Sequence, residues 1–264
     1  MITLVENAAI AYDDVGSGMP VVFLHAFPLN RTMWDPQVSA LVGECRCIAI
    51  DVRGLGESAP MPPYSVDRYA DDVAGVLDAL QIERAVVVGL SLGGYVAFAL
   101  WRRHRDRVRG FVFADTRASG DTPDGIERRR RLIEIAETQG SIGVANMQIA
   151  GLVGKTTREK RPDIYDATHR MMAQAPVDGV IGGLEALMTR PDSTTTCATI
   201  TVPTLIVVGE EDAITPPKEA RRLQQSIPGS RLEVLRQAGH LSSLERPAAF
   251  TTVLSEYLAR LIYN

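Results

Sequence analysis

The chain has 264 residues, of which 45% are hydrophobic and 23% are charged, and its formal net charge at pH 7 is −4. This composition is that of an ordinary globular protein, and its acidic balance argues against nucleic acid or an anionic membrane as the main partner. No apolar run approaches the roughly 20 residues that cross a bilayer, and no export signal is visible near the N-terminus. The cysteines have neither metal-ligand nor paired spacing and suit a reduced, cytoplasmic protein: Cys45, Cys47 and Cys197.

Short, nearly continuous apolar runs recur along the chain and are typical of strands that are buried on both faces of a sheet. In chain order they cover residues 21–25, 47–50, 85–89, 110–114, 204–209 and 231–235. Helical patterns lie between or after them, at 66–81, 91–104, 216–226 and 246–262. This alternation predicts an α/β fold with a mostly parallel central sheet flanked by helices.

One long segment interrupts the alternation. Residues 117–199 contain no convincing strand, and glycines and prolines divide the segment into several short helical patterns. We therefore predict a helical cap at 117–199, inserted into a core that is formed by residues 1–116 and 200–264.

The stretch GLSLG at 89–93 places Ser91 at a tight corner between a predicted strand and a predicted helix. The glycines relieve crowding there, so the hydroxyl of Ser91 can stand above the edge of the sheet. The cluster does not fit a dinucleotide fingerprint or a P-loop, because the glycine and lysine positions of those motifs are absent. A serine is a weak nucleophile at neutral pH and needs a base that is oriented by a third group.

Candidates for the base and the acid follow other predicted strands, where catalytic groups gather in α/β sheets. His240 lies in a loop bounded by Gly239, between the last predicted strand and the last helix. Asp212 follows the strand at 204–209 and is the preferred acid. The alternative acids that the sequence leaves open are Glu210, Glu211 and Asp115.

The order Ser91, Asp212, His240, together with the G-x-S-x-G elbow, resembles the α/β-hydrolase superfamily of serine hydrolases. The segment DVRGLGES resembles a loop of the same superfamily. The segments MWDPQVSAL and GHLSSLERPAAF are similar to the branch of 3-oxoadipate enol-lactonases, bacterial carboxylesterases and N-acyl-homoserine lactonases. The resemblance implies the α/β-hydrolase fold, a Ser-His-Asp triad and an acyl-enzyme. It implies neither a metal nor an organic cofactor.

The resemblance also implies an oxyanion hole made of two backbone amides. The residue after the nucleophile, Leu92, supplies one of them, and a loop after an early strand supplies the other. That loop reads His25-Ala26-Phe27-Pro28, and Phe27 is the expected donor because Pro28 has no N–H. Further candidates for contact with the substrate are His25, as a brace of this loop, and the apolar residues Trp34, Met147, Met171, Met172 and Leu187.

The sequence thus predicts an enzyme that hydrolyses small carboxylic esters or lactones, with N-acyl-homoserine lactones among the candidates. An enol-lactone of a small diacid would need a buried cation for its carboxylate, and the sequence places none beside Ser91. Three alternatives stay open: a 3-oxoadipate enol-lactone hydrolase, a perhydrolase or C–C bond hydrolase with the same triad, and a ligand-binding protein with a hydrolase fold.

Overall fold

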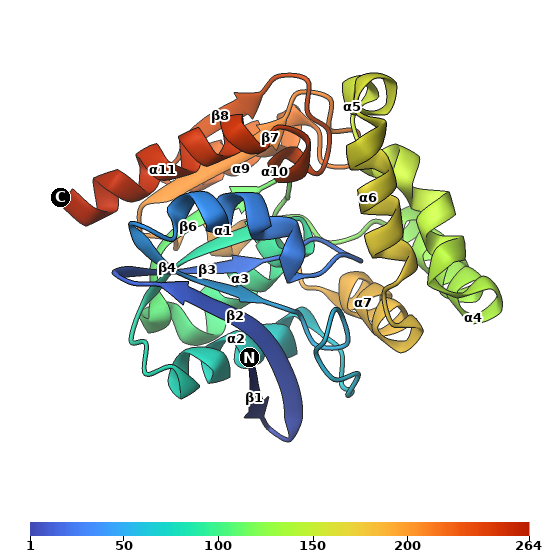
Figure 1. The fold of residues 1–264 in the computed structure, drawn as a ribbon, viewed down its shortest axis with the longest axis horizontal. Coiled ribbons are helices and arrows are strands. Elements are labelled where there is room, and N and C mark those ends of the chain that lie inside the picture. Colours follow the sequence, from blue (N-terminus) through green and yellow to red (C-terminus); the bar gives the residue numbers. More distant parts are fainter. Residues whose placement is uncertain (264) are drawn as a thin grey trace.

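The computed structural model describes residues 1–263 and contains one central sheet with helices on both faces (Figure 1). The order of the strands in the sheet is β1-β2-β4-β3-β5-β6-β7-β8. The pairs β1–β2 and β2–β4 are antiparallel, and the remaining pairs are parallel. The strands are β1 (Ile2–Val5), β2 (Ala8–Gly16), β3 (Met19–Leu24), β4 (Cys45–Ile50), β5 (Ala85–Leu90), β6 (Val108–Ala114), β7 (Thr204–Gly209) and β8 (Arg231–Leu235).

The helices of the core pack on the sheet in two groups. Side chains of α2 (Val66–Ala79), α3 (Leu92–His104) and α9 (Pro217–Ser226) join one apolar cluster. Those of α1 (Asp35–Leu41) and α11 (Pro247–Tyr263) join another. Consecutive residues of the central strands alternate between the two clusters, which explains why these strands are apolar at nearly every position. The short helices of the core are η1 (Arg31–Trp34), η2 (Arg105–Arg107) and α10 (Ser242–Glu245).

The predicted strands and core helices are all present, with ends shifted by no more than two residues. The prediction missed β1, β2 and α1. In β1, Ile2 and Leu4 face solvent, and β2 ends in two half-buried aspartates followed by the exposed Val15 and Gly16. Neither strand therefore shows the continuous apolar run of a central strand. The strand order and the run of parallel pairs confirm the predicted α/β class with a mostly parallel central sheet.

The segment between β6 and β7 holds the helices that the sequence indicated. They are α4 (Pro123–Leu152), α5 (Lys155–Lys160), α6 (Pro162–Ala173), α7 (Val177–Thr189) and α8 (Thr194–Cys197). Figure 1 shows α4 to α7 gathered on one side of the sheet. The longest, α4, is divided at Gly140, where the backbone has φ 70° and ψ −174°. We refer to 117–199 as the cap segment.

Candidate active site

Ser91 lies at the corner where β5 ends and α3 begins. Its backbone has φ 53° and ψ −107°, a strained conformation for a residue with a side chain. A Cβ atom on Gly89 would lie 2.3 Å from the carbonyl oxygen of Gly93, and one on Gly93 would lie 2.2 Å from that of Leu24. Only glycine fits at these two positions, so the GLSLG sequence is what allows so sharp a turn.

The structure brings Ser91, His240 and Asp212 into one line of hydrogen bonds. Ser91 Oγ lies 2.8 Å from His240 Nε2, although the two residues are 149 positions apart in the sequence. On the other side of the ring, His240 Nδ1 lies 2.9 Å from Asp212 Oδ2. Ser91 is partly exposed, whereas the His240 and Asp212 residues are only 2% and 3% exposed. This geometry is that of a nucleophile, a base and an orienting acid.

The carboxylate of Asp212 is held by its own loop. Its Oδ1 accepts the amides of Ile214 and Thr215 at 2.8 and 2.9 Å, and its Oδ2 accepts the hydroxyl of Thr215 at 2.7 Å. Burial by itself would raise the pKa of Asp212, but His240 and these donors outweigh it and hold that pKa at about 2. Sequence analysis missed Thr215. A threonine three residues after a loop aspartate is a common local hydrogen-bonding pattern and could have indicated it.

Burial favours the neutral form of His240, but the surrounding negative charges act in the opposite direction and prevail. Asp212 contributes most of this effect, and the pKa of His240 is raised above its usual value, with Asp115 and Glu245 as further contributors. The imidazole is therefore a stronger base than an ordinary histidine, and Asp212 stabilises the imidazolium that forms when it takes a proton.

The alternative acids lie elsewhere. Asp115 is fully buried, and its carboxyl group accepts the amide of Gly209 at 2.8 Å and both the amide and hydroxyl of Ser242, at 3.2 and 2.5 Å. Burial and the nearby charge of Asp212 raise the pKa of Asp115 well above its usual range. Glu210 accepts the amide of Gln237, and Glu211 accepts the amide and hydroxyl of Thr156. Among the carboxylates of residues 1–263, it is Asp212 that hydrogen-bonds to the His240 ring.

The two predicted oxyanion donors lie on the loop after β3 and at the start of α3. Within the described part of the chain, the amides of Phe27 and Leu92 have no protein acceptor. The loop is closed by a hydrogen bond of 2.8 Å from the amide of Leu29 to the carbonyl of Ala26. The ring of Phe27 packs closely against Gly183 of α7, where a Cβ would lie only 2.8 Å away. A helix of the cap segment thus supports this loop.

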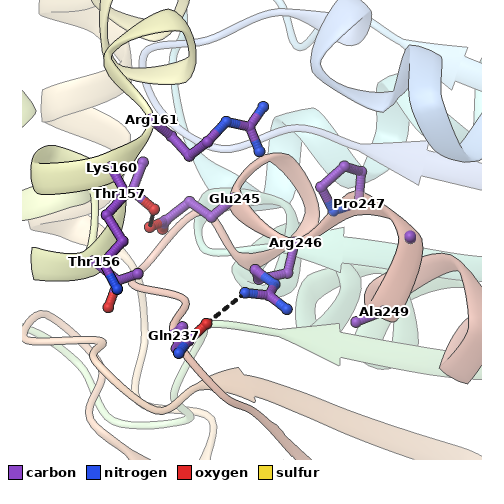
Figure 2. Close-up of a pocket in the computed structure, with 10 residues that line it drawn as sticks. Thr156, Thr157, Lys160, Arg161, Gln237, Glu245, Arg246, Pro247 and Ala249 are labelled. Atoms are coloured by element: carbon purple, nitrogen blue, oxygen red, sulfur yellow. Dashed lines mark hydrogen bonds between the residues drawn. The ribbon is translucent and has the colours of Figure 1, made fainter.

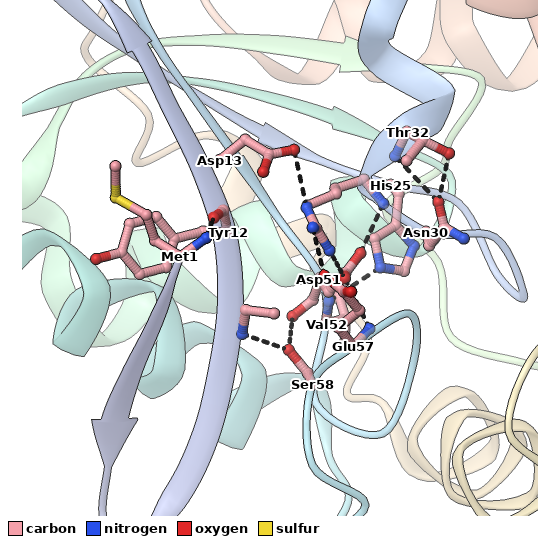
Figure 3. Close-up of polar contacts among 12 residues, drawn as sticks. Met1, Tyr12, Asp13, His25, Asn30, Thr32, Asp51, Val52, Glu57 and Ser58 are labelled. Carbon is pink, nitrogen blue, oxygen red and sulfur yellow. Dashed lines mark hydrogen bonds and ion pairs between the residues drawn. The ribbon is translucent and has the colours of Figure 1, made fainter.

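His25 and a network around Asp51 fix the base of the same loop (Figure 3). His25 Nδ1 donates to the carbonyl of Ala26, and its Nε2 accepts the amide of Val52, both at 2.9 Å. Burial lowers the pKa of His25, so the ring stays neutral and keeps this tautomer. Asp51 accepts the amide of Arg31 at 2.7 Å and pairs with its guanidinium. These contacts support a bracing role for His25.

The apolar residues predicted to contact the substrate have different surroundings. Trp34 is fully buried, with its ring centre 5.4 Å from that of Phe23 and 5.8 Å from that of Phe250. Met147 is 64% exposed on α4. Neither placement supports a contact with the substrate. Three other candidates pack between helices of the cap segment and the core, where they remain predicted lining residues: Met171, Met172 and Leu187.

A pocket of about 380 Å³ lies between α5 and the start of α11 (Figure 2). Its wall includes Thr156, Thr157 and Glu245, and cationic side chains from both sides. It contains none of the three residues of the hydrogen-bonded line. The pocket is lined by Thr156, Thr157, Lys160, Arg161, Gln237, Glu245, Arg246, Pro247, Ala248 and Ala249.

Comparison with known proteins gives a family for this arrangement. The model of the alpha/beta hydrolase family matches residues 21–253. The chain belongs to this family. It is 30% identical over 246 residues to 3-oxoadipate enol-lactonase 1 of Acinetobacter baylyi, an alignment that covers 90% of this chain and 88% of the relative.

Two solved structures are similar over nearly the whole chain. A thermophilic esterase from Thermogutta terrifontis is 38% identical with a TM-score of 0.95, and the match covers 99% of this chain and 97% of the esterase. An N-acyl homoserine lactone degrading enzyme is 30% identical with a TM-score of 0.84, and the match covers 97% and 99%. The family resemblance predicted from the motifs is confirmed, and so is the class of enzyme to which it pointed, the carboxylic ester hydrolases.

Two findings concern membrane crossing and the state of the cysteines. Within residues 1–263, none of the helices combines the length and the apolar character that a membrane crossing needs. Cys45, Cys47 and Cys197 are buried and are not joined by disulfides. Burial raises the pKa of Cys47 and of Cys197 to about 12, so these thiols stay protonated at neutral pH.

Proposed function

We propose that the protein hydrolyses carboxylic esters or lactones through an acyl-enzyme formed on Ser91. The observation that carries this proposal is the line of hydrogen bonds from Ser91 Oγ through His240 to Asp212, at 2.8 and 2.9 Å. The names of the relatives, which include an enol-lactonase and an esterase, support the same chemistry.

In the first half of the reaction, Ser91 Oγ attacks the carbonyl carbon and passes its proton to His240 Nε2. The oxyanion that forms accepts the amides of Phe27 and Leu92, which have no other acceptor. Collapse of the intermediate expels the alkoxide, which takes the proton from His240. In the second half, His240 removes a proton from water, the resulting nucleophile attacks the acyl carbon, and the acid leaves while Ser91 regains its proton.

We propose an uncharged acyl group as the preferred acid part of the substrate. The helices of the cap segment present buried apolar side chains, among them Met172, Leu184 and Leu187. The lactone degrading relative supports N-acyl-homoserine lactones as one class of such substrates. Open esters with the same acyl chain are the other class, since the triad itself does not distinguish a cyclic from an open ester.

An enol-lactone with a free carboxylate is the second candidate, because the structure contains a buried cation that the sequence did not indicate. Arg190 is 6% exposed, and its guanidinium lies 4.3 Å from the ring centre of Tyr95, on the first turn of α3. However, Arg190 already pairs with the buried Asp121 at 2.7 Å. Asp121 also pairs with Arg117 and Arg129, so it does not neutralise Arg190 by itself. The guanidinium of Arg190 is nevertheless already engaged by Asp121, by the carbonyl of Leu187 and by the ring of Tyr95, and for this reason we rank the uncharged acyl group first.

The test compares wild type with Ser91→Ala on two substrates that share one medium-length acyl chain: the N-acyl-homoserine lactone and the p-nitrophenyl ester. We expect the wild type to hydrolyse both and Ser91→Ala to hydrolyse neither, with the thermal unfolding midpoint preserved. Ser226→Ala, at the end of α9, is the matched control and should behave as wild type.

Each result of this comparison has a consequence. Residual turnover by Ser91→Ala near the wild-type rate would refute the mechanism. Hydrolysis of the activated ester alone would keep the triad and move the search to enol-lactones and small open esters. Turnover that requires hydrogen peroxide would favour the perhydrolase, and a single burst without steady state would favour the binding protein.

A further inference from the structure

The loop that carries His240 is fixed at four consecutive backbone amides, those of residues 239–242. Two of them, at 239 and 241, donate to Glu245 Oε1 at 2.9 and 3.2 Å. The amide of His240 donates to the carbonyl of Leu152 at 3.0 Å, and that of residue 242 donates to Asp115 Oδ2 at 3.2 Å. The three acceptor atoms all lie outside this short stretch, so the position of the imidazole depends on groups that surround the loop.

The other oxygen of Glu245 contacts the cap segment. Oε2 accepts the amide of Gly154 at 2.8 Å and the hydroxyl of Thr157 at 2.5 Å, where α5 begins. Glu245 is 1% exposed, and Figure 2 shows it beside Thr157 on the wall of the pocket. Because it accepts four hydrogen bonds, two from each side, this one side chain joins the His240 loop to the start of α5.

A second glutamate joins the same part of α5 to the loop of the acid. Glu211, which precedes Asp212, accepts the amide and hydroxyl of Thr156 at 2.7 and 2.5 Å. The first turn of α5 therefore touches both loops that hold the imidazole and its carboxylate. The two glutamates differ in burial, because Glu211 is half-buried whereas Glu245 is enclosed.

We propose that Glu245 is a positioning residue for the reaction. It holds the His240 loop against the start of α5, so the position of the cap segment affects the geometry of the base. The proposal rests on the proposed function of Ser91, His240 and Asp212. A displacement of a catalytic group by about 1 Å can cost on the order of 100-fold in rate, so a contact that holds the loop matters even though it touches no substrate.

The charge of Glu245 adds an effect that simple packing would lack. The carboxyl groups around His240 are Asp212, Asp115 and Glu245. Asp212 raises the pKa of His240 most, Glu245 adds to this effect, and Asp115, whose own pKa is raised, contributes only when it is ionised. The cations that line the pocket beside Glu245 are Lys160, Arg161 and Arg246. Removal of the charge at 245 should therefore lower the pKa of His240. Since the base acts in its neutral form, the acid limb of the pH profile should then move to lower pH.

The main experiment uses Glu245→Gln in the full-length protein, with p-nitrophenyl acetate as a substrate too small to need the cap segment. The oxygen of the new amide can still accept two of the four hydrogen bonds. Its NH2 group, however, must face the two remaining donors, which it cannot accept. We expect kcat to fall by about 10- to 100-fold, KM to change by less than about threefold, and the acid limb of kcat/KM to shift to lower pH. Glu233→Gln removes one half-buried charge on β8, which pairs with Arg231, and should leave all three unchanged.

Thr157→Val provides a milder variant in case Glu245→Gln does not fold. It removes one donor to Oε2 and nothing on the side of His240. We expect kcat to fall by about two- to tenfold with the unfolding midpoint nearly unchanged. A folded Glu245→Gln with wild-type kcat and pH profile would overturn the proposal. If that variant does not fold, wild-type kcat in Thr157→Val would overturn it instead.

A measurement without substrate separates this proposal from the proposed function. NMR titration of histidines labelled at Cε1 follows the pKa of His240 directly, and the chain has only 4 histidines to assign. If the wild type hydrolyses no ester, the proposed function fails. A lower pKa of His240 in Glu245→Gln than in wild type would even then support the placement of Glu245. An unchanged pKa together with unchanged kcat would refute it.

Discussion

The Asp212→Asn variant tests whether Asp212 sets the tautomer of His240. Oδ1 of Asp212 accepts two backbone amides at 2.8 and 2.9 Å, so the oxygen of the new side chain will take this position and its NH2 will face His240 Nδ1. An NH2 group can only donate, so Nδ1 must accept. The single proton of the neutral ring then moves to Nε2, and Nε2 can no longer take a proton from Ser91.

We expect kcat/KM to fall about 10⁴-fold, the loss typical when the acid of a Ser-His-Asp triad is replaced by its amide. This loss corresponds to about 5.4 kcal/mol of transition-state stabilisation. The assay is the initial rate of p-nitrophenyl ester hydrolysis, with circular dichroism and the thermal unfolding midpoint as checks of the fold. The fold should persist, because the new side chain keeps both backbone contacts of Oδ1.

Asp115→Asn is the matched control, since it makes the same chemical change in a fully buried carboxyl group nearby. Asp115 contacts Gly209 and Ser242 and not the imidazole. Its raised pKa means that the neutral amide replaces a group already disposed to be neutral. We expect a loss of less than about tenfold, as for a displaced contact. A loss near 10⁴-fold in Asp115→Asn, with near-normal activity in Asp212→Asn, would refute the assignment of the acid.

Three further predictions concern pH, the elbow and stability. Because the pKa of His240 is raised and its neutral form is the base, kcat/KM should rise with pH through a midpoint above 6.5. A midpoint at or below 6.5 in the pH–rate profile would contradict this. Gly93→Ala places a Cβ 2.2 Å from a backbone oxygen and should abolish activity and lower the unfolding midpoint, whereas Gly43→Ala, with nothing within 4 Å, should do neither. Asp72→Ala leaves the buried guanidinium of Arg53 unpaired and should cost about 3–5 kcal/mol in urea unfolding, compared with less than about 1 kcal/mol for the exposed Asp78→Ala.

The sequence was most informative where a local rule has only one solution. Ser91 lies between glycines at a strand–helix corner, and the structure shows that a side chain at Gly89 or Gly93 would strike a carbonyl oxygen. His240 and Asp212 were found because loops after parallel strands converge at one edge of the sheet. The contact of Thr215 with Asp212 could also have been predicted, from the threonine three residues after the aspartate. By contrast, β1 and β2 were missed because edge strands lack the apolar run that marks a buried one.

Contacts between segments far apart in the chain could not be predicted from such local rules. Glu245 reaches Thr157 across 88 residues, and nothing in the sequence around either one indicates the other. Arg190 is a buried cation because Asp121 and the ring of Tyr95 enclose it, whereas the sequence shows only an arginine followed by a proline. Trp34 was expected beside the substrate, and the structure encloses it between the rings of Phe23 and Phe250.

The sequence by itself determined the central strands and the larger core helices in chain order, the sharp turn at Ser91 and the kinds of residue available as base and acid. These follow from backbone sterics and from the period of apolar residues, which act over a few positions. Only the tertiary structure decided which carboxylate meets His240, what holds the His240 loop and which apolar side chains face the cap segment. Those outcomes depend on distances between residues far apart in the chain, and such distances exist only once the sheet and the cap segment have packed together.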